Sequence, residues 1–409
     1  MQWSSRAMLR LLIVNILDRE EKIMAEWVER KISDIGTVVG GATPSTKKPE
    51  NYEDGKIAWI TPKDLSTFSS RYIEHGERNI TEIGLKSCST QLLPPNTILF
   101  SSRAPIGYVA IAANEVCTNQ GFKSVVPNEN TDPLFLYYLL KYNKDKIEGM
   151  GSGTTFKEVS GNTMKNIVVS VPTDKEVQKK ISSMLGSIDD KIEENERINN
   201  NLEQQAQAIY QQMFIDNASL EWTEGTLSDI ADITMGQSPS GSSYNEDGNG
   251  TIFFQGRAEF SFRFPTVRLF TTEPKRMACA NDTLMSVRAP VGDLNVAYTD
   301  CCIGRGLAAI HSKDNHQSFV LYTMFSLKKQ LNVFNGEGTV FGSINRNSLN
   351  EMPILIPSSE KLDEFEALTS PMNAAIRNNY DEICRLEQLR DSLLPKLMSG
   401  ELDVSDIDL

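Results

Sequence analysis

The most constraining feature of this sequence is that the chain repeats itself. Laying Trp27 on Trp222 superposes eight identical residues within nineteen positions. In the first copy these are Trp27, Glu29, Ser33, Asp34, Ile35, Gly41, Pro44 and Ser45, and in the second Trp222, Glu224, Ser228, Asp229, Ile230, Gly236, Pro239 and Ser240. A long internal period indicates repeated structural units. We therefore expect two copies of one architecture.

The repeat continues further along the chain at a slightly smaller offset, which lays Ser101 on Ser286. It pairs Ser101, Arg103, Ala104, Pro105 and Gly107 with Ser286, Arg288, Ala289, Pro290 and Gly292, and Cys117 with Cys302. It also pairs Gly151, Gly153, Thr154 and Phe156 with Gly336, Gly338, Thr339 and Phe341, Asn162 with Asn347, and Pro172 with Pro357. The smaller offset predicts one loop that is ten residues longer in the first copy.

A helical segment follows each closing proline, at the offset that lays Ile188 on Met372. Its apolar positions recur in a 4-3-4-3 pattern, which is typical of a coiled-coil seam. The first seam comprises Ile188, Ile192, Asn195, Asn199, Leu202, Ala206, Ile209 and Met213, and the second Met372, Ile376, Asn379, Ile383, Leu386, Arg390, Leu393 and Leu397. Asn195 and Asn379 are equivalent, and a buried Asn in a seam fixes its register. The two stripes either pair with each other or pack on their own globular halves.

Each helical segment is expected to begin with a short helix, then break. Ser370 and Pro371 resemble an N-cap followed by a first-turn proline, and Gly186 with Ser187 stands at the matching point. A long helix of roughly 28 residues, or about 40 Å, would follow in each copy.

The globular parts are predicted to be α+β. Short β-like runs are interrupted by Gly, Pro and Asn, whereas 133–146 and 318–332 each read as one amphipathic helix. The β-like runs are 97–101, 107–112, 167–171 and 352–356. The predicted domains are residues 25–172 and 217–357, each followed by a helical region, 173–216 and 358–409.

Residues 1–24 are predicted to be an N-terminal extension, either untranslated because synthesis starts at Met24 or loosely packed. Its apolar stretch 7–17 is too short to span a membrane, for which about 20 residues are needed. Cys88, Cys117, Cys279, Cys301, Cys302 and Cys384 form no CxxC pair. Reduced thiols fit a cytoplasmic location best.

Signatures of catalysis and metal binding are missing from the sequence. It contains no phosphate loop, no dinucleotide fingerprint, no amino-methyltransferase tetrapeptide and no HExxH. His75, His311 and His316 make an unconvincing metal set, and Cys302, matched by Cys117, is best explained as a small buried residue. We expect no catalytic residue, metal or cofactor on this chain.

Taken together, these motifs resemble the specificity subunit of type I restriction-modification systems. The resemblance rests on the openings at Trp27 and Trp222, the Gly-x-x-Pro-Ser loops ending at Ser45 and Ser240, Ser-x-Arg-Ala-Pro-x-Gly at 101–107 and 286–292, and Gly-x-Gly-Thr-x-Phe at 151 and 336. To these are added the helix with Ile-Asp-Asp-Lys-Ile at 188–192 and the stretch 393–401. The second helix departs from this pattern with Met-Asn-Ala-Ala-Ile at 372–376.

The resemblance implies a non-catalytic DNA reader with two target recognition domains held apart by an antiparallel coiled coil. Each domain would read half of a bipartite, asymmetric target. Two modification subunits would methylate adenine, and two restriction subunits would translocate and cleave. S-adenosylmethionine, Mg²⁺ and ATP would bind those partners. The main alternative is a protein-interaction scaffold, and a less favoured one is a nuclease or methyltransferase with cryptic motifs.

Comparing the copies suggests which residues contact DNA. Shared residues cannot distinguish two half-sites, so Arg103 and Arg288, with Thr154 and Thr339, are candidates for phosphate contact or for structuring loops. Unmatched polar loop residues are the candidates for base reading. These are Lys47, Lys48, Lys63, Arg71, Asn119, Gln120, Lys123 and Lys157 in the first copy, and Gln237, Gln255, Arg257, Arg263, Arg305, Asn345 and Arg346 in the second. Phe260, Phe262 and Phe264 alternate around Arg263 and are interpreted as a strand face.

The net charge of −13 at first argues against an anionic partner, but the acidity is uneven. Residues 26–172 carry 16 basic and 16 acidic side chains, and 217–357 carry 11 and 14. The helical regions 173–215 and 358–409 carry 5 and 8, and 5 and 12. We expect the nearly neutral domains to contact DNA and to bind it only weakly without partner subunits. The acidic helices and tail are expected to contact those subunits.

Overall fold

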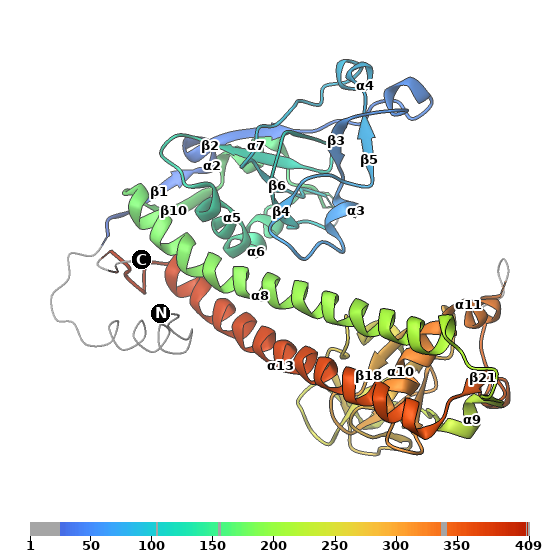
Figure 1. The fold of residues 1–409 in the computed structure, drawn as a ribbon. Helices are drawn as coiled ribbons and strands as arrows, with labels where there is room; N and C mark the ends of the chain where they lie inside the picture. The colour runs from blue at the N-terminus through green and yellow to red at the C-terminus, as the bar shows by residue number, and fades with distance from the viewer. Residues whose placement is uncertain (1–24, 104, 154–156, 337–341, 406, 408–409) are drawn as a thin grey trace, which may run out of the picture. The chain divides into compact units, whose positions relative to one another are not determined.

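The computed structural model describes residues 25–103, 105–153, 157–336, 342–405 and 407 (Figure 1). The predicted extension 1–24, together with Thr154 and Thr339, lies outside the described residues. The chain divides into two units. Unit 1 joins Met1–Glu194 to Glu382–Leu409, and unit 2 is Asn195–Asp381. The described residues after Glu382 therefore belong with the first half of the described chain.

Unit 1 contains two small sheets and one strand pair. The five-stranded sheet has the order β2-β9-β6-β7-β4, the three-stranded sheet β5-β3-β8, and β1 pairs antiparallel with β10. The strands are β1 (Trp27–Lys31), β2 (Gly36–Gly40), β3 (Ile57–Ile60), β4 (Tyr72–Ile73), β5 (Arg78–Ile80), β6 (Ile98–Phe100), β7 (Val109–Ala112), β8 (Val116–Thr118), β9 (Lys123–Pro127) and β10 (Val168–Pro172). The short helices are α2 (Ile32–Ile35), η1 (Pro49–Asn51), α3 (Pro62–Leu65), α4 (Glu82–Lys86), α5 (Pro133–Tyr142), α6 (Lys144–Gly149) and α7 (Gly161–Asn166).

Unit 2 has the corresponding arrangement. Its sheets have the orders β12-β20-β17-β18 and β13-β15-β14-β19-β16, and β11 pairs antiparallel with β21. The strands are β11 (Thr223–Thr226), β12 (Ala231–Met235), β13 (Tyr244–Asn245), β14 (Thr251–Phe254), β15 (Leu269–Thr271), β16 (Met277–Ala278), β17 (Thr283–Ser286), β18 (Leu294–Val296), β19 (Cys301–Ile303), β20 (Leu307–Ser312) and β21 (Pro353–Ile356). The short helices are α9 (Leu227–Ile230), η3 (Gly241–Ser243), η4 (Arg257–Glu259), α10 (Gln317–Ser326), α11 (Lys328–Leu331), η5 (Asn332–Asn335) and α12 (Arg346–Asn350).

The two units confirm the predicted α+β repeat. The series β2-β9-β6-β7 of unit 1 corresponds to β12-β20-β17-β18 of unit 2, and the parallel pair β3·β8 corresponds to β14·β19. In both units a capping box at the same place opens the helix after the first strand, with Asp34 and Asp229 each accepting from the N-cap backbone. The shared Ser-Asp-Ile sequence therefore serves the fold.

The predicted helix break in each repeat is wrong. α8 runs without interruption from Lys175 to Tyr210 and continues as one π-helical turn, η2 (Gln211–Asp216), and α13 runs from Ser359 to Met398. Ser370 and Pro371 lie inside α13, both exposed. A proline inside a helix lacks one backbone N–H, so one carbonyl of the preceding turn is left to bond water. On the outer face this cost is small, and the packing of the inner face keeps the helix continuous.

Within each unit, a stretch of α8 packs antiparallel on a stretch of α13 (Figure 1). In unit 1, Asp189 accepts from Arg390 at 2.9 Å. In unit 2, Asn379 Nδ2 donates to Asn199 Oδ1 at 2.9 Å. The predicted seam residues of both helices are buried or half-buried. The two seams therefore meet each other, as predicted.

Two single helices predicted from periodicity are each divided. Asn143 separates α5 from α6, and Leu327 separates α10 from α11. The Asn143 side chain donates to the Leu139 carbonyl at 2.9 Å. This local bond satisfies a carbonyl at the end of α5 and lets the chain turn there.

The core of unit 1 is completed by the end of the chain. Leu397, Met398 and Val404 are at most 1% exposed and pack with residues of α5, α7 and β10. Gly400 has a φ of +76°, and a Cβ there would lie 2.7 Å from the Trp27 indole nitrogen. The opening tryptophan of the repeat therefore packs against the C-terminal segment.

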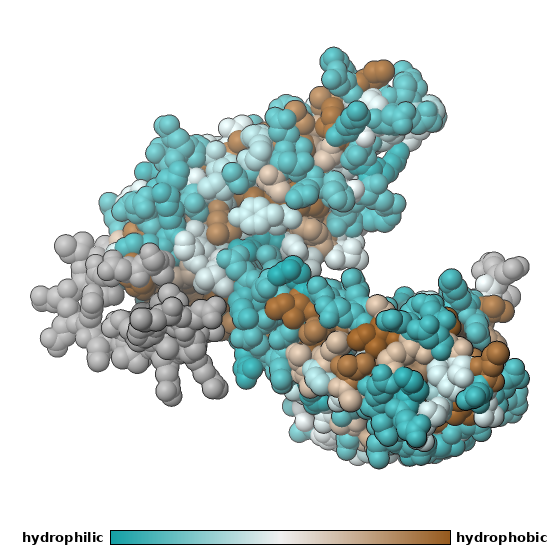
Figure 2. Space-filling view, viewed as in Figure 1, coloured by the Kyte–Doolittle hydropathy of each residue, from teal (hydrophilic) through white to brown (hydrophobic). Residues whose placement is uncertain are grey.

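The visible face of each unit carries mainly hydrophilic residues, with apolar ones scattered between them (Figure 2). Scattered apolar residues are normal on protein surfaces. No helix in the described part of the chain is long and apolar enough to cross a membrane.

Candidate nucleic-acid interface

The Ser-x-Arg-Ala-Pro-x-Gly motif forms a loop that its own serine closes. In unit 1, Ser101 Oγ donates to the Pro105 carbonyl at 2.9 Å and accepts from the Tyr108 amide at 2.8 Å. Gly107 has a φ of +95°, which a residue with a Cβ rarely adopts. The motif thus sets the direction of the chain around Arg103.

The same loop recurs in unit 2 with the same bonds. Ser286 Oγ donates to the Pro290 carbonyl at 2.7 Å and accepts from the Asp293 amide at 2.9 Å. Gly292 has a φ of +85°. Arg288 therefore occupies the same place in unit 2 as Arg103 in unit 1, and both side chains reach the surface.

Backbone hydrogen bonds bring four predicted loops of unit 2 together. The Gln237 amide donates to the Ile303 carbonyl at 3.0 Å, and the Gly304 amide donates to the Phe254 carbonyl at 2.8 Å. The Val287 amide donates to the Gly306 carbonyl at 2.9 Å. These bonds join the loops that carry the candidate residues Gln237, Gln255, Arg305 and Arg288, which we call loop cluster 2.

Unit 1 has the equivalent loop cluster 1. The Ala42 amide donates to the Thr118 carbonyl and the Asn119 amide to the Ile60 carbonyl, each at 3.0 Å. The Ser102 amide donates to the Gly121 carbonyl at 2.7 Å. The cluster joins the loops that carry the candidate residues Lys47, Lys48, Lys63, Arg103, Asn119 and Gln120.

The shared glycine of the Gly-x-x-Pro-Ser loop permits this convergence. A Cβ on Gly41 would lie 2.2 Å from the backbone oxygens of Thr118 and Asn119, and a Cβ on Gly236 would lie 2.2 Å from the Gly304 oxygen. Only glycine allows the backbones to approach this closely. The motif therefore builds the cluster and needs no contact with DNA to explain it.

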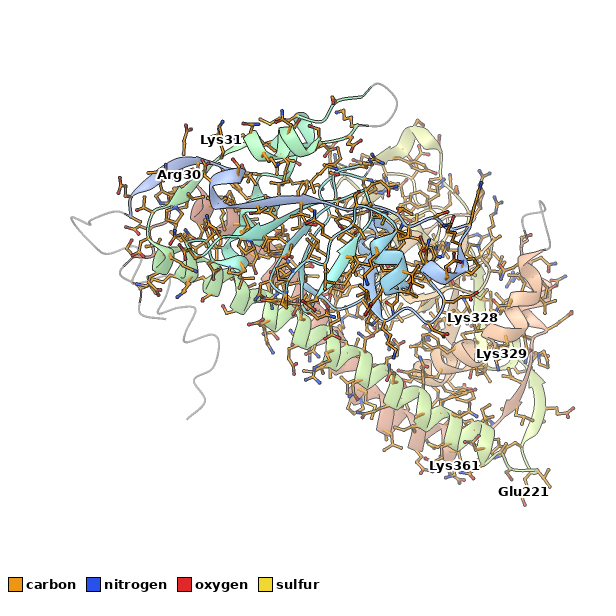
Figure 3. The ribbon with its side chains drawn as sticks, turned by 90° about the horizontal axis from the view of Figure 1, so that it is seen from above. Arg30, Lys31, Glu221, Lys328, Lys329 and Lys361 are labelled. Atoms are coloured by element: carbon orange, nitrogen blue, oxygen red, sulfur yellow. The ribbon has the colours of Figure 1, made fainter. Side chains whose placement is uncertain are left out.

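Charges in the clusters are partly neutralised by acidic neighbours. Lys63 pairs with Glu77 at 2.7 Å, and Arg257 pairs with Asp293, which also accepts from Lys328 at 2.6 Å. Figure 3 labels Lys328, on α11. Partial burial raises the pKa of Asp293, but the hydrogen bonds and charges of Lys328 and Arg257 hold it below its usual value.

Arg103 and Lys123 share one carboxylate in cluster 1. Glu158 lies 3.1 Å from Arg103 Nε and 3.5 Å from Lys123 Nζ. Burial opposes ionisation of Glu158, but its hydrogen bond to Arg103 and the charges of both cations keep its pKa below the usual value. The position equivalent to Glu158 in unit 2 is Ser343, which bridges to Arg288 as Glu158 does to Arg103.

Two of the predicted DNA readers are instead buried anchors. Arg71 is 5% exposed and donates to the Glu193 carboxylate at 3.1 Å and to Asp190, both on α8. Its hydrogen bonds to these acids raise the pKa of its guanidinium although burial opposes this. A guanidinium that is committed to a helix in this way is not available to a base edge.

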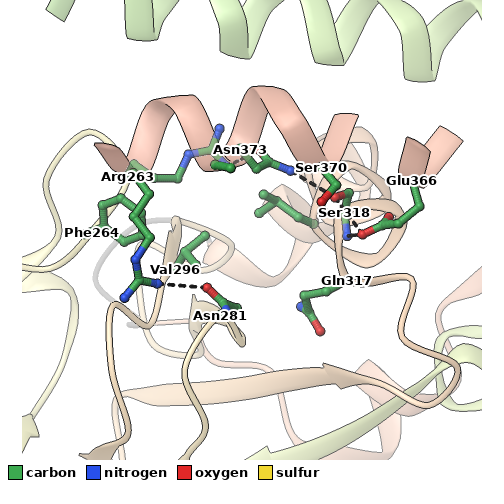
Figure 4. A pocket seen from close by; sticks show the side chains of 12 residues that line it. Arg263, Phe264, Asn281, Val296, Gln317, Ser318, Glu366, Ser370 and Asn373 are labelled. Carbon is green, nitrogen blue, oxygen red and sulfur yellow. Dashed lines mark hydrogen bonds between the residues drawn. The ribbon is translucent and has the colours of Figure 1, made fainter. Parts of the chain in front are cut away.

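Arg263 is the second anchor and corrects the prediction for its segment. It is 5% exposed and donates to Glu203 at 3.0 Å and to Asn373 at 3.4 Å (Figure 4). The predicted strand at 260–264 is absent because Arg263 turns toward the long helices and Phe264 packs edge-on against Tyr298. Phe262 is exposed.

Sequence reasoning missed the tyrosines that complete these anchors. Tyr138 Oη donates to Asp189 at 2.6 Å, and Tyr322 Oη donates to Asn373 at 3.1 Å. Both pairs are related by the offset that aligned the helical seams. Extending that offset back to residue 138 would have revealed the equivalence.

Most of the remaining candidates are exposed, whereas Asn119 and Lys123 are half-buried, and some of the set have structural duties. Asn119 Oδ1 accepts from the Gly121 amide at 2.8 Å, Gln120 bonds Thr43, and Asn345 Oδ1 caps α12 through the Ser348 amide at 3.0 Å. The side chains that lie exposed in the clusters or beside them are Lys47, Lys48, Lys63, Arg103, Gln120 and Lys157 in unit 1, and Gln237, Gln255, Arg257, Arg288, Arg305, Asn345 and Arg346 in unit 2.

Other kinds of site find little support in the described residues. They contain no group of three or more His, Cys, Asp or Glu side chains that could hold a metal ion. A cavity of about 350 Å³ in unit 2 lies against the Arg263 anchor, with Gln317, Ser318 and Glu366 in its wall (Figure 4). Glu366 accepts from the Ser318 amide and hydroxyl, so this polar wall is part of the packing of α10 on α13.

Comparison with known proteins gives consistent results. The family model described as "Type I restriction modification DNA specificity domain" matches residues 24–204 and 219–378. The chain is 33% identical over 422 residues to the type I restriction enzyme MjaIX specificity subunit of Methanocaldococcus jannaschii, covering 94% of this chain and 96% of the relative. It is 23% identical to the HindI specificity subunit of Haemophilus influenzae, covering 93% of this chain and 100% of that one.

A solved structure has a similar fold. The type I restriction-modification S subunit from M. genitalium superposes with a TM-score of 0.60 at 16% identity, over 93% of this chain and 98% of that one. At this identity the likeness concerns the fold.

Proposed function

Since this chain belongs to the family of type I restriction-modification DNA specificity subunits, we propose that each of its two loop clusters reads one half of a bipartite, asymmetric DNA target. The chain supplies DNA sequence specificity in a restriction-modification system. Members of its family are non-catalytic recognition subunits. The exposed side chains of the two loop clusters are the candidates for reading the DNA.

The observation that carries the proposal is one backbone framework with two sets of exposed polar side chains. Gln120 in cluster 1 is replaced by Arg305 in cluster 2. Lys63 corresponds to Arg257, because each stands three residues after the end of the equivalent strands β3 and β14. A bidentate Gln suits adenine, whereas Arg suits guanine. Equal frameworks with unequal side chains support two half-sites of different sequence.

Partner subunits complete the activity in this proposal. Two modification subunits, with S-adenosylmethionine, methylate adenine in the target, and two restriction subunits use ATP and Mg²⁺ to translocate and cleave. The acidic balance of residues 173–215 and 358–409 supports docking of these proteins on the helical regions, because a DNA backbone would be repelled there.

The test is methylation sequencing of a host with and without this gene, both carrying intact partner genes. We expect adenine methylation at one bipartite asymmetric sequence only when the gene is present. An unchanged methylome would sink the proposal. If the chain still co-purified with partner proteins in that case, the protein-interaction scaffold would be favoured instead.

A domain exchange provides the internal control. Replacing residues 217–357 by the equivalent domain of a relative with a different target should change one half-site and leave the other unchanged. A change in both half-sites would contradict independent reading by the two clusters.

A further inference from the structure

The two shared arginines differ in what surrounds them. In unit 1, Arg103 Nε donates to Glu158 at 3.1 Å, and Lys123 lies 3.5 Å from the same carboxylate. The side chains of Arg103 and Glu158 are 46% and 35% exposed, and that of Lys123 is 14% exposed. A carboxylate thus stands beside the guanidinium, at the surface of cluster 1.

Unit 2 lacks both of the charges that flank Arg103. Ser343 stands where Glu158 does, as the offset that lays Arg103 on Arg288 and the matching backbone bridge to Arg288 both indicate. Ala308 replaces Lys123. Within the described residues, no acidic side chain forms an ion pair with Arg288, which is exposed.

Net charge does not separate the two sites, because both sum to +1. At these three equivalent positions unit 1 holds two cations and one anion, and unit 2 holds the single cation Arg288 with Ser343 and Ala308. The difference lies in what an approaching phosphate meets. At Arg288 it meets a guanidinium that no acidic side chain of the described residues pairs with, and at Arg103 it meets a guanidinium shared with a carboxylate that repels it.

The backbone of Glu158 is fixed beside Arg103, which keeps its carboxylate within reach of both cations. Its backbone amide donates to the Ser152 carbonyl at 2.9 Å, and its carbonyl accepts from the Ser152 amide at 3.0 Å. The mostly buried Lys123 holds the carboxylate from a second direction. The carboxylate therefore has two cationic partners, one of them mostly buried, whereas an ordinary surface ion pair has one exposed partner and contributes little.

We propose that Arg288 makes a phosphate contact that Arg103 does not, because Glu158 occupies in unit 1 the place that a DNA phosphate takes in unit 2. Unit 2 then makes a phosphate contact that unit 1 lacks, whereas Arg103 stabilises its own loop by pairing with Glu158. The inference rests on the proposed function and assigns different duties to two residues that the repeat makes identical.

The experiment measures the salt dependence of DNA affinity. The full chain in complex with its modification subunit binds a duplex that carries the target, over a series of salt concentrations. Each phosphate contact contributes about 0.9 to the slope of log affinity against log salt. Arg288→Gln should lower the slope by about 0.9 and weaken binding roughly tenfold. The matched variant Arg103→Gln should change the slope by less than about 0.3.

Reciprocal exchanges at the flanking position sharpen the test. Glu158→Ser should free Arg103 and steepen the slope by about one contact, so that adding Arg103→Gln then removes that gain. Ser343→Glu should flatten the slope of unit 2 and make Arg288→Gln nearly silent in that background. Both positions are at the surface, and thermal unfolding of each variant checks that the fold is kept.

The outcomes separate this inference from the proposed function. Equal slope changes for Arg103→Gln and Arg288→Gln, or no effect of the reciprocal exchanges, would overturn the inference while target binding remains. If the wild-type complex bound the bipartite sequence that is methylated in the host no better than an unrelated duplex, the proposed function would be overturned, and the inference with it.

Discussion

At the residue scale, the structure separates arginines that the sequence could not. Arg71 and Arg263 are polar loop residues, and such residues are mostly exposed, so both were predicted to face DNA. Their separation along the chain matches none of the three offsets found in the sequence, because the loops around them differ in length. Backbone hydrogen bonds identify them as equivalent, because the Arg71 carbonyl accepts from the Ile111 amide and the Arg263 carbonyl from the Val296 amide, each at 2.8 Å. Both side chains also pair with acids of α8.

A buried anchor makes a prediction about stability and pH. Arg263→Met should lower the unfolding free energy by about 3 kcal/mol near neutral pH, because Glu203 is left buried without its cation. Burial raises the pKa of Glu203 and Arg263 opposes this. Without Arg263 the folded-state pKa rises further above that of the unfolded chain. The loss should therefore grow as pH rises from about 4, where the carboxyl is protonated, towards 8.

Urea unfolding of the full chain at several pH values measures this effect. Adding Glu203→Met to Arg263→Met removes the stranded carboxyl and should recover much of the loss and most of its pH dependence. The exposed Lys48→Ala serves as the control and should stay within about 0.5 kcal/mol of wild type. A pH-independent effect of Arg263→Met would show that lost packing, rather than the charge of Glu203, causes it.

At the element scale, the seam pattern predicted the pairing of α8 and α13 because a 3.5-residue period needs a facing partner. The same sequence led to a wrong break at Ser370 and Pro371. Local capping signals describe an isolated peptide, whereas the packed faces of a long helix outweigh the loss of one backbone hydrogen bond on its outer side. The prediction of one helix over 133–146 was wrong because a local signal ends α5 at Asn143. A single side-chain hydrogen bond to the Leu139 carbonyl leaves no trace in the periodicity of apolar residues.

The Asn199–Asn379 hydrogen bond is expected to set the register of the helices at some cost in stability. Asn379→Leu should lower the unfolding free energy by about 1–3 kcal/mol, because Asn199, 2% exposed, loses its donor. The double variant Asn199→Leu with Asn379→Leu should be at least as stable as wild type. Chemical denaturation gives both values.

The exposed Asn200 provides a matched control in the next position of the same helix. Its side chain donates to the Glu196 carbonyl one turn earlier, and Asn200→Ala should change stability by less than about 0.5 kcal/mol. If the double variant were as unstable as Asn379→Leu alone, the pair would contribute packing that leucines cannot replace.

At the scale of the whole molecule, the repeat predicted two units but could not predict where unit 1 ends. Sequence order places Leu397, Met398 and Val404 in the helical region 358–409, where Leu397 is a predicted seam residue and Met398 lies in the stretch 393–401 that carries the resemblance. In the structure they are core residues of the first unit, more than two hundred residues away along the chain. A long-range contact of this kind leaves no local signal. The converging loops were partly predictable, because the shared motifs marked them, whereas the pairing of Glu158 with Arg103 was not.

Truncation after Pro395 should therefore destabilise the globular part of unit 1, which lies in the first half of the sequence. Removing three fully buried apolar side chains costs about 5–8 kcal/mol, comparable with the whole stability of a domain. Hydrogen exchange should show lost amide protection across residues 27–172 and retained protection across 223–356. Ser399→Ala, an exposed substitution in the same segment, is the control. A uniform loss over both units would contradict this assignment of the C-terminal residues.

The same packing sets an order of events during synthesis. The segment Asn195–Asp381 leaves the ribosome complete, with every residue of unit 2 available, while unit 1 still lacks one side of its core. The half of the protein that is translated first is thus the half that matures last. Trp27 and its neighbours can complete their packing only after the last turn of α13 and the segment that follows it have been synthesised. A premature stop near the end of the message would then remove the first recognition domain and spare the second.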